Sequence, residues 1–248
     1  MIRLMSASSR IQERDYKDGT CHCYRFINLT IVDAGRRFTL LSLPMGKFTS
    51  QTEAVRKLLE FARGKIGIKR VYLDRGFFRV DTINLLDAMG IEYLMPAIKD
   101  QKIKETCDMM SAPSVIKGYR RGNEKKSAHF NLVILKAMEE EDKLVFATNM
   151  EIGKREGELA AWLLPLYSKR WGIETTHRVT KGLRAKTTSR NYVIRLFYHL
   201  FSVLLYNLWV IINLLIGVSL LAKVPEKPLI VASTFGTTFY MMFEVEIT

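Results

Sequence analysis

The sequence is poor in cysteine, which excludes two kinds of stabilised domain. Three cysteines occur in 248 residues at irregular spacing, a pattern that suits reduced thiols and forms no disulfide framework. Cys21 and Cys23 flank His22 in an apparent strand, where alternate side chains point to opposite faces, so His22 cannot join both thiols around one ion. The sequence therefore predicts neither a disulfide-rich domain nor a zinc site.

The opening residues, MIRLMSASSRIQERD, lack the apolar core of a signal peptide. Secretion is therefore not predicted. Together with the low cysteine count, this favours a cytoplasmic location.

Acidic residues are scarce relative to basic ones. Asp and Glu number 25 against 38 Lys and Arg, which leaves a formal net charge of +13. Such a surplus usually reflects a polyanionic partner, with nucleic acid the leading candidate and a membrane surface the second. The alternative is a cytosolic protein that is simply basic. With 48% hydrophobic residues the chain can bury a core, so a globular protein is expected.

The run from Leu196 to Ala222 lacks Lys, Arg, Asp and Glu, and its length could span a bilayer. Within it, however, His199, Ser202, Tyr206 and Asn213 fall within an arc of roughly 60° on a helix. A polar stripe suits a helix buried against protein better than one surrounded by lipid. We therefore expect a core helix and no membrane partner, with a membrane-anchored basic protein as the alternative.

Residues 21–98 alternate between strand and helix patterns in the order β-β-α-β-α-β, which predicts a mixed α/β layer arrangement. The two opening strands are joined at Asp33-Ala34-Gly35, a hairpin signal. From Lys99 to Lys126 the chain is polar and basic, and an exposed loop or hairpin tip is expected there. Two further strand patterns follow, and beyond Gly157 the pattern is helical.

A constellation of polar residues occurs in the helical part. Tyr167, Arg170, Glu174 and Lys181 fall within roughly 60° of one another on a continuous helix, and Arg178 lies close to the same line. A carboxylate flanked by cationic and hydroxyl groups is what a phosphodiester-cutting site requires. A solvated face with ordinary ion pairing would give the same pattern.

Asp74 stands at the carboxyl end of the apolar run VYLD and directly before a glycine turn. Sites in open α/β sheets form at such strand ends, so the carboxylate can face a ligand. A turn-initiating aspartate is the alternative interpretation.

These residues together resemble a known family. Tyr167-x2-Arg170-x3-Glu174-x6-Lys181 is similar to the Y-R-E-K signature of a large class of insertion-sequence DDE transposases, and it matches at all four positions. Asp74, within L-D-R-G-F, resembles the second aspartate of that class. Phe146 to Asn149, F-A-T-N, resembles the end of the β-rich insertion that these enzymes carry between the second aspartate and the glutamate.

The resemblance implies an RNase H-like mixed sheet flanked by helices, with a β-rich insertion. Asp74 and Glu174 would be catalytic metal ligands for a pair of Mg²⁺ or Mn²⁺ ions, as in other two-metal sites. The DNA-contacting residues would be Tyr167, Arg170, Arg178 and Lys181. The expected partner is double-stranded DNA, as transposon ends and target, bound by a dimer.

The sequence departs from the family pattern at its start. The first catalytic aspartate ends the first core strand in the family, but the residues before Cys21 contain no apolar strand that ends in aspartate. Asp15 and Asp18 are the available aspartates there, and their polar surroundings indicate a loop. We therefore expect the first core strand to be missing and the chain to be a truncated, inactive transposase, with a DNA-binding remnant as the alternative.

The resemblance also predicts a division of the chain into three parts. These are an incomplete N-terminal part of the catalytic core at 1–98, the β-rich insertion at 99–150, and a helical part that completes the core at 151–248.

Overall fold

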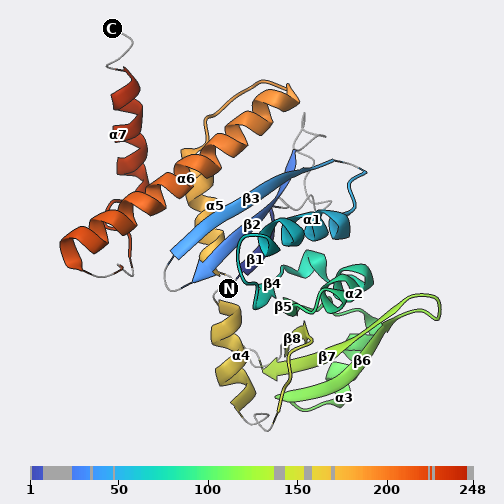
Figure 1. Cartoon of the computed structure of the whole chain (residues 1–248). Helices are drawn as coiled ribbons and strands as arrows, with labels where there is room; N and C mark the ends of the chain where they lie inside the picture. The colour runs from blue at the N-terminus through green and yellow to red at the C-terminus, as the bar shows by residue number, and fades with distance from the viewer. Residues whose placement is uncertain are drawn as a thin grey trace. The chain divides into compact units, whose positions relative to one another are not determined.

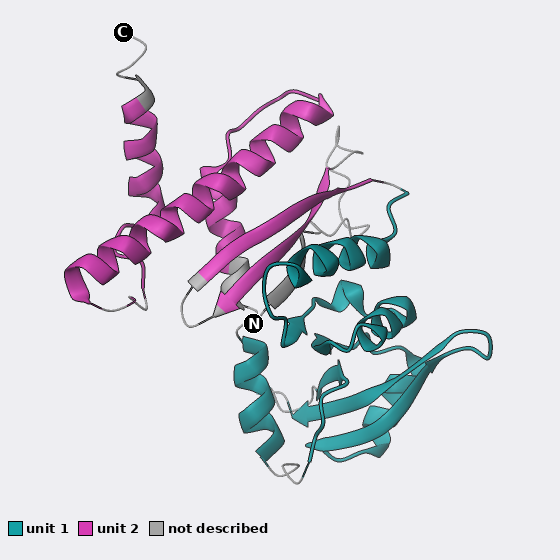
Figure 2. Ribbon diagram, viewed as in Figure 1, with its two compact units in different colours: residues 1–6, 47–170 teal, residues 7–46, 171–248 magenta. Residues whose placement is uncertain are grey.

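The structure is a computed structural model. It describes residues 2–7, 24–33, 36–46, 48–136, 143–153, 158–168, 171–222, 224 and 227–244. The chain forms two compact units, residues 1–6 with 47–170 (unit 1) and residues 7–46 with 171–248 (unit 2), as Figure 2 shows. The three-part division expected from the sequence describes the catalytic core and its insertion, not compact units, and it stays a prediction.

Three parallel strands form the centre of unit 1 (Figure 1). They are β1 (Ile2–Ala7), β4 (Arg70–Tyr72) and β5 (Glu92–Pro96), and β4 pairs in parallel with both others. The apolar residues of β4 and β5 are buried on both faces, as expected for parallel strands covered by helices.

Strand β1 corrects one expectation. We expected no strand before Cys21, but Ile2 and Arg3 pair with Val71 and Tyr72 of β4. A strand therefore occupies the place predicted to be empty, and the expectation of a missing opening strand is wrong. The polar and apolar residues of its sequence, IRLMSA, alternate too weakly to predict a strand. The strand contains no aspartate or glutamate. Cys21, Cys23, Asp15 and Asp18 lie outside the described residues.

Two helices of unit 1 form where the apolar spacing predicts them. Helix α1 (Gln51–Arg63) begins at Ser50, whose side chain accepts a hydrogen bond from the backbone N–H of Glu53, and buries its apolar face. Helix α2 (Val80–Ala88) follows the turn after β4 and packs against α1 and β5.

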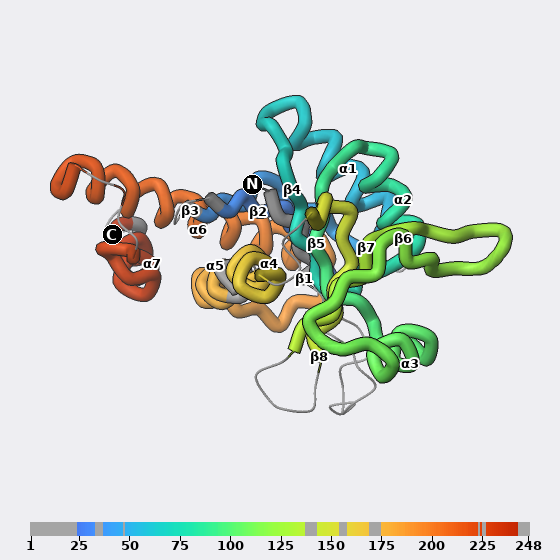
Figure 3. The backbone as a smooth tube through the Cα atoms, turned by 90° about the horizontal axis from the view of Figure 1, so that it is seen from below, coloured from blue at the N-terminus to red at the C-terminus, as the bar shows by residue number. Residues whose placement is uncertain are grey.

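The β-rich insertion continues the sheet of unit 1 with antiparallel strands. Strand β8 (Lys143–Thr148) pairs with β5, β7 (Ser127–Lys136) pairs with β8, and β6 (Ser114–Gly122) pairs with β7. The hairpin tip predicted within the basic stretch is confirmed, and both Figure 1 and Figure 3 show the β6–β7 hairpin extending from the rest of unit 1.

The stretch expected to be a loop also contains a helix and a strand. Helix α3 (Gln101–Met109) is capped by the Asp100 carboxylate, which accepts a hydrogen bond from the backbone N–H of Ile103 at 3.0 Å. It buries only Ile103 and Cys107, so the apolar pattern is too sparse to predict a helix.

Gly122 closes the β6–β7 hairpin in a conformation that side chains disfavour. Its φ is +120°, and a Cβ built there would lie 2.2 Å from the carbonyl oxygen of Lys126. Any other residue would therefore force the two strands apart at the tip.

Unit 2 is built on an antiparallel hairpin of β2 (Arg25–Asp33) and β3 (Arg36–Met45). The hairpin is the one predicted from the sequence, although Ala34 and Gly35 lie outside the described residues. Three helices accompany it, α5 (Trp171–Leu183), α6 (Tyr192–Leu221) and α7 (Ala232–Glu244). Helix α6 runs along β3 (Figure 1) and begins at Asn191, whose side chain accepts hydrogen bonds from Val193 and Ile194.

The polar stripe of α6 faces protein. His199, Ser202, Tyr206 and Asn213 are all buried, which confirms the predicted orientation of this stripe. Asn207 pairs with both backbone groups of Thr39 in β3, accepting from its N–H at 3.0 Å and donating to its carbonyl at 2.9 Å. Among the described residues α6 is the one helix long and apolar enough to cross a membrane, but core helices meet the same criteria.

His199 on α6 is buried against the β2–β3 hairpin. Its imidazole stacks on Phe26 with ring centroids 3.8 Å apart, and its Nε2 lies 2.8 Å from the hydroxyl of Ser42. Burial, together with the smaller effects of the charges of Arg184 and His177, lowers the pKa of His199 to about 4. The imidazole is therefore neutral in the folded state near neutral pH.

This environment predicts acid sensitivity in unit 2. Because the folded pKa of about 4 lies below the ordinary 6.5, the contribution of His199 is intact above pH 6.5 and is lost as the pH falls toward 4. The full loss is on the order of 3 kcal/mol. Urea unfolding measured across this pH range should show the decline, and His199→Gln should flatten it.

His129→Gln is the matched control, because His129 is exposed on β7. It should leave the pH dependence as in the unmodified chain. An equally steep decline in the His199→Gln variant would contradict the assignment.

Candidate active site

Asp74 follows the central strand of unit 1 and starts a tight turn. It precedes the 3-10 helix η1 (Arg75–Phe77), and its backbone carbonyl accepts a hydrogen bond from the N–H of Phe77 at 2.9 Å. Phe77 and Phe78 are buried and anchor the turn. The Asp74 side chain is half-buried and does not cap η1. Asp74 therefore initiates the turn through its backbone carbonyl, as the alternative interpretation predicted. Its side chain makes no capping hydrogen bond to η1.

The strand register places Tyr167 at the same edge of the sheet as Asp74. Because β4 and β5 are parallel and in register, Asp74 follows β4 at the level of Pro96 in β5. Pro96 pairs with Phe146 of β8. The ring of Phe146 packs edge to face on the ring of Tyr167, with centroids 4.8 Å apart.

Helix α4 (Leu159–Ser168), which carries Tyr167, covers the face of the sheet on which Tyr72 lies. Leu159 and Leu163 of α4 are fully buried in one apolar cluster with Tyr72. Side chains alternate along an extended chain, so Asp74 is on the same face as Tyr72. Two predicted site residues, Asp74 and Tyr167, thus share one face and one edge of unit 1. Tyr167 is half-buried, and part of its ring serves packing.

Helix α5 of unit 2 separates a packed face from a charged face. Thr176 and Thr180 are buried, and Leu183 packs against the cluster formed by α6 and α7; the hydroxyl of Thr176 lies 3.0 Å from that of Tyr206. Arg178 and Lys181 lie on the opposite side and are exposed. Helix geometry puts position 174 on the same side as these two, within roughly 60°.

The predicted single helical face is described only in part. Tyr167 belongs to α4 and position 174 to α5, while Arg170 lies between them, outside the described residues. Arg178 and Lys181 share the exposed face of α5. The placement of the Tyr167, Arg170 and Glu174 side chains on that same face stays a prediction. Asp74 is in unit 1 and Glu174 in unit 2, so the approach of their carboxylates stays a prediction.

One residue that supports β5 was recognised in the sequence only as part of a family pattern. Asn149 follows β8, and its side-chain oxygen accepts a hydrogen bond from the backbone N–H of Tyr93 at 3.0 Å. Its amide group donates to the carbonyl of Ile91 at 3.0 Å and to the carboxylate of Asp87 at 2.9 Å. The F-A-T-N sequence was the available signal, and its asparagine joins β5, β8 and the end of α2.

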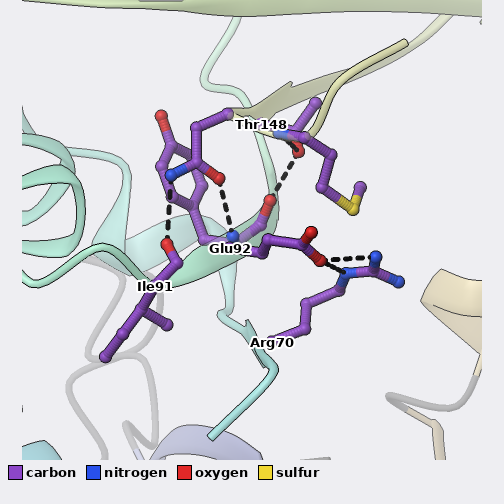
Figure 4. Close-up of polar contacts among 7 residues, drawn as sticks. Arg70, Ile91, Glu92 and Thr148 are labelled. Atoms are coloured by element: carbon purple, nitrogen blue, oxygen red, sulfur yellow. Dashed lines mark hydrogen bonds and ion pairs between the residues drawn. The ribbon is translucent and has the colours of Figure 1, made fainter. Parts of the chain in front are cut away.

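Figure 4 shows how tightly this network surrounds β5. The hydroxyl of Thr148 donates to the carbonyl of Tyr93 at 2.6 Å, and Arg70 pairs with Glu92 across β4 and β5 at 2.6 Å. Burial raises the pKa of the Tyr93 hydroxyl, so this ring is neutral. The network fixes β5 against β8, and β5 in turn holds β4 and Asp74.

The residues that could hold a metal are few. Among the described residues no group of three His, Cys, Asp or Glu side chains is arranged to hold an ion. Asp74 suits an oxygen ligand for a hard cation, because it carries a half-buried carboxylate just beyond the end of a central strand. This donor fits a divalent ion only if carboxylates from elsewhere in the chain complete the set.

The family model described as "Transposase DDE domain" matches residues 12–208, which include Asp74, the β-rich insertion and the whole Y-R-E-K pattern. The chain belongs to the DDE transposase family. This membership confirms the resemblance drawn from the sequence, and the family generally uses a divalent metal.

A solved structure supports the fold. The chain is similar to a piggyBac transposase solved by cryo-EM in a synaptic complex with hairpin DNA, with a TM-score of 0.60 and 12% sequence identity. The similarity covers 97% of this chain and 51% of the other, so this chain spans about half the length of that transposase. The mixed α/β transposase fold expected from the sequence is thereby confirmed. No curated protein matches the sequence.

The hydrogen bonds of Asn149 predict that this side chain stabilises β5, the strand that pairs with β4. Asn149→Ala leaves the backbone groups of Tyr93 and Ile91 without their partner, which should lower the free energy of unfolding by about 1–3 kcal/mol. Chemical denaturation followed by circular dichroism would measure this.

Asn84→Ala is the comparison variant, because this exposed amide makes a single bond to the carbonyl of Ser127. This variant should lower the free energy of unfolding by clearly less than Asn149→Ala does. Equal losses in the two variants would argue against a special role for Asn149.

Proposed function

We propose that this chain acts on double-stranded DNA as an insertion-sequence transposase, with metal-dependent strand cleavage and transfer as its chemistry. The observation that carries the proposal is the pair of surfaces described above. Asp74 stands at the end of a central parallel strand, and the exposed face of α5 presents Arg178 and Lys181 beside position 174. Both occur in a chain of the DDE family.

Each predicted residue has a chemical task in this proposal. Asp74 and Glu174 would hold divalent ions, Mg²⁺ or Mn²⁺ in a two-metal arrangement, whose chemistry is to activate the attacking oxygen and stabilise the leaving one. Arg178 and Lys181 pair with phosphates on either side of the cleaved bond, as Arg170 would. Tyr167 borders the DNA at the edge of unit 1, where Phe146 holds its ring.

The β6–β7 hairpin provides a second basic surface. Lys117, Arg120 and Lys125 are exposed there, whereas Arg121 is paired with Asp100 at 3.1 Å and Lys126 is paired with Asp81. The first three are therefore the better candidates for phosphate contacts. In the transposition reaction two copies of the chain would act together on the DNA as a dimer.

A second candidate function is DNA binding without cleavage. It is favoured by β1, because a strand lies at this position and contains no carboxylate. A pair of carboxylates without a third would hold two metal ions poorly. Asp15 and Asp18 are the aspartates that could complete the set.

The proposal predicts DNA binding that depends strongly on salt. If the basic residues neutralise about six phosphates, affinity should fall by roughly a thousandfold between about 50 and 200 mM salt, because binding releases condensed counterions. Fluorescence anisotropy with a labelled duplex would measure this. Arg178→Ala with Lys181→Ala should weaken binding and reduce the salt slope by about two.

The control is Lys57→Ala with Lys65→Ala, which removes the same charge from exposed positions on or beside α1. It should change affinity much less. Binding that is insensitive to salt, or equal losses in the two double variants, would remove the proposed interface.

Cleavage is predicted to separate the two candidate functions. If Asp15 or Asp18 supplies the third carboxylate, nicking of a transposon-end duplex will require Mg²⁺ or Mn²⁺ and will be abolished by Glu174→Gln, by Asp74→Asn and by one of Asp15→Asn and Asp18→Asn. These changes remove a metal ligand and should leave DNA affinity within about threefold. Binding without any nicking would favour the second candidate.

A further inference from the structure

Helix α6 carries a continuous apolar stripe on the side away from its buried polar stripe. The residues of this stripe, which we call the α6 seam, are Phe197, Phe201, Leu204, Leu208, Ile211, Leu215 and Val218. Successive members are four and three residues apart in strict alternation. A mean spacing of 3.5 residues keeps side chains aligned along one helix when it packs against another helix at a shallow angle.

The seam is exposed within the described structure. Leu204 and Leu215 are 60% and 62% exposed, Leu208 is half-buried, and the other members are exposed. Taking roughly 150–200 Å² for each side chain of this size, the seam leaves on the order of 500 Å² of apolar surface open. Val193 and Leu200 flank it and are exposed too, which brings the total to roughly 700 Å², close to the roughly 800 Å² per partner of a stable interface.

The seam itself carries no charged side chain, and the nearest charge at its hollow end is Arg184. Arg195, near the start of α6, is the one Lys, Arg, Asp or Glu residue in the helix, and its guanidinium donates to the carbonyl of Ser189 at 2.7 Å. Two copies of a chain with a net charge of +13 repel each other over most of their surfaces. The seam is where two copies can meet without that repulsion.

The apolar surface continues from the seam into a hollow of about 740 Å³ between α5, α6 and α7. Phe201 belongs to the seam and also lines the hollow. Leu205, Phe239 and Tyr240 are among the other residues that line the hollow. A second helix on the seam could therefore insert side chains into a preformed recess at one end.

A bilayer is a poorer occupant for this face. The opposite side of α6 is bonded to β3 through Asn207 and to the backbone of Ile230 through Trp209 and Asn213. A helix crossing a membrane would have to carry these polar neighbours, including the strand β3, into the hydrocarbon.

We infer that the α6 seam is the surface through which two copies of this chain associate, by two-fold packing of one α6 on the other. This inference rests on the proposed function for its purpose, because it supplies the contact that holds two copies together on DNA. An isologous contact needs one self-complementary stripe, and the seam is such a stripe. The association does not require DNA, so the chain is a dimer before it binds.

Sedimentation equilibrium of the full chain without DNA tests this. The unmodified chain should be dimeric at micromolar concentration. Leu204→Gln with Leu215→Gln should raise the dissociation constant of the dimer by at least about a hundredfold, because it buries unpaired amides in the contact. The unfolding temperature should change little, since both side chains face away from the core.

Met109→Gln is the control, because Met109 is 84% exposed on α3 and lies off the seam. It should leave the dimer intact. A monomeric unmodified chain, a double variant that still dimerises, or recovery only in detergent would overturn the inference. So would a double variant that loses thermal stability without a change in association, because the seam would then be covered within its own chain.

The two proposals can fail separately. Glutamine adds no charge, so binding of the monomeric double variant to a short duplex should match that of the unmodified chain per subunit. If the chain is a dimer but binds no DNA, the proposed function is wrong, whereas the seam remains supported as the contact between the two copies.

Discussion

The parallel pairing of β4 with β5 is the constraint on which the rest of unit 1 depends. Both strands are buried on both faces, so their backbone groups find partners only in each other and in β1 and β8. This pairing sets where β4 ends and hence where Asp74 emerges. It also aligns Pro96 with Phe146, which positions Tyr167 through ring packing. Asp74 and Tyr167 are distant in sequence but lie at the same edge of the sheet, because the hydrogen bonds among β4, β5 and β8 fix the register of these strands.

The elements predicted correctly are those with a strong local pattern. The β2–β3 hairpin, α1, β4 and α2 each bury a regular set of apolar residues, and Asp74 follows β4 closely, near the strand end where it was predicted. Helix α3 was missed because it buries only two residues and depends on its Asp100 cap and on bonds from Lys143 to its last carbonyls. Strand β1 was missed because parallel pairing with β4, which no local pattern reveals, is what makes it a strand.

The candidate site shows the same division between local and long-range information. Helical spacing correctly placed Arg178 and Lys181 on one exposed side of α5, since that spacing is a property of a single helix. Tyr167 lies at the end of α4, and residues 169 and 170 lie outside the described part of the chain, so a single face that runs from Tyr167 to position 174 stays a prediction. The role of Asn149 as a bridge between β5 and α2 depends on contacts across many residues and could be recognised only by family likeness.

Asn207 has a consequence for the solubility of the chain. Strand β3 is an edge strand, and an edge with free backbone groups is a template for strand addition and aggregation. The side chain of Asn207 accepts from and donates to Thr39 in the middle of that edge, as a neighbouring strand residue would. One amide on α6 therefore occupies the position where a foreign strand would begin to pair, and it guards the hairpin against amyloid-like extension.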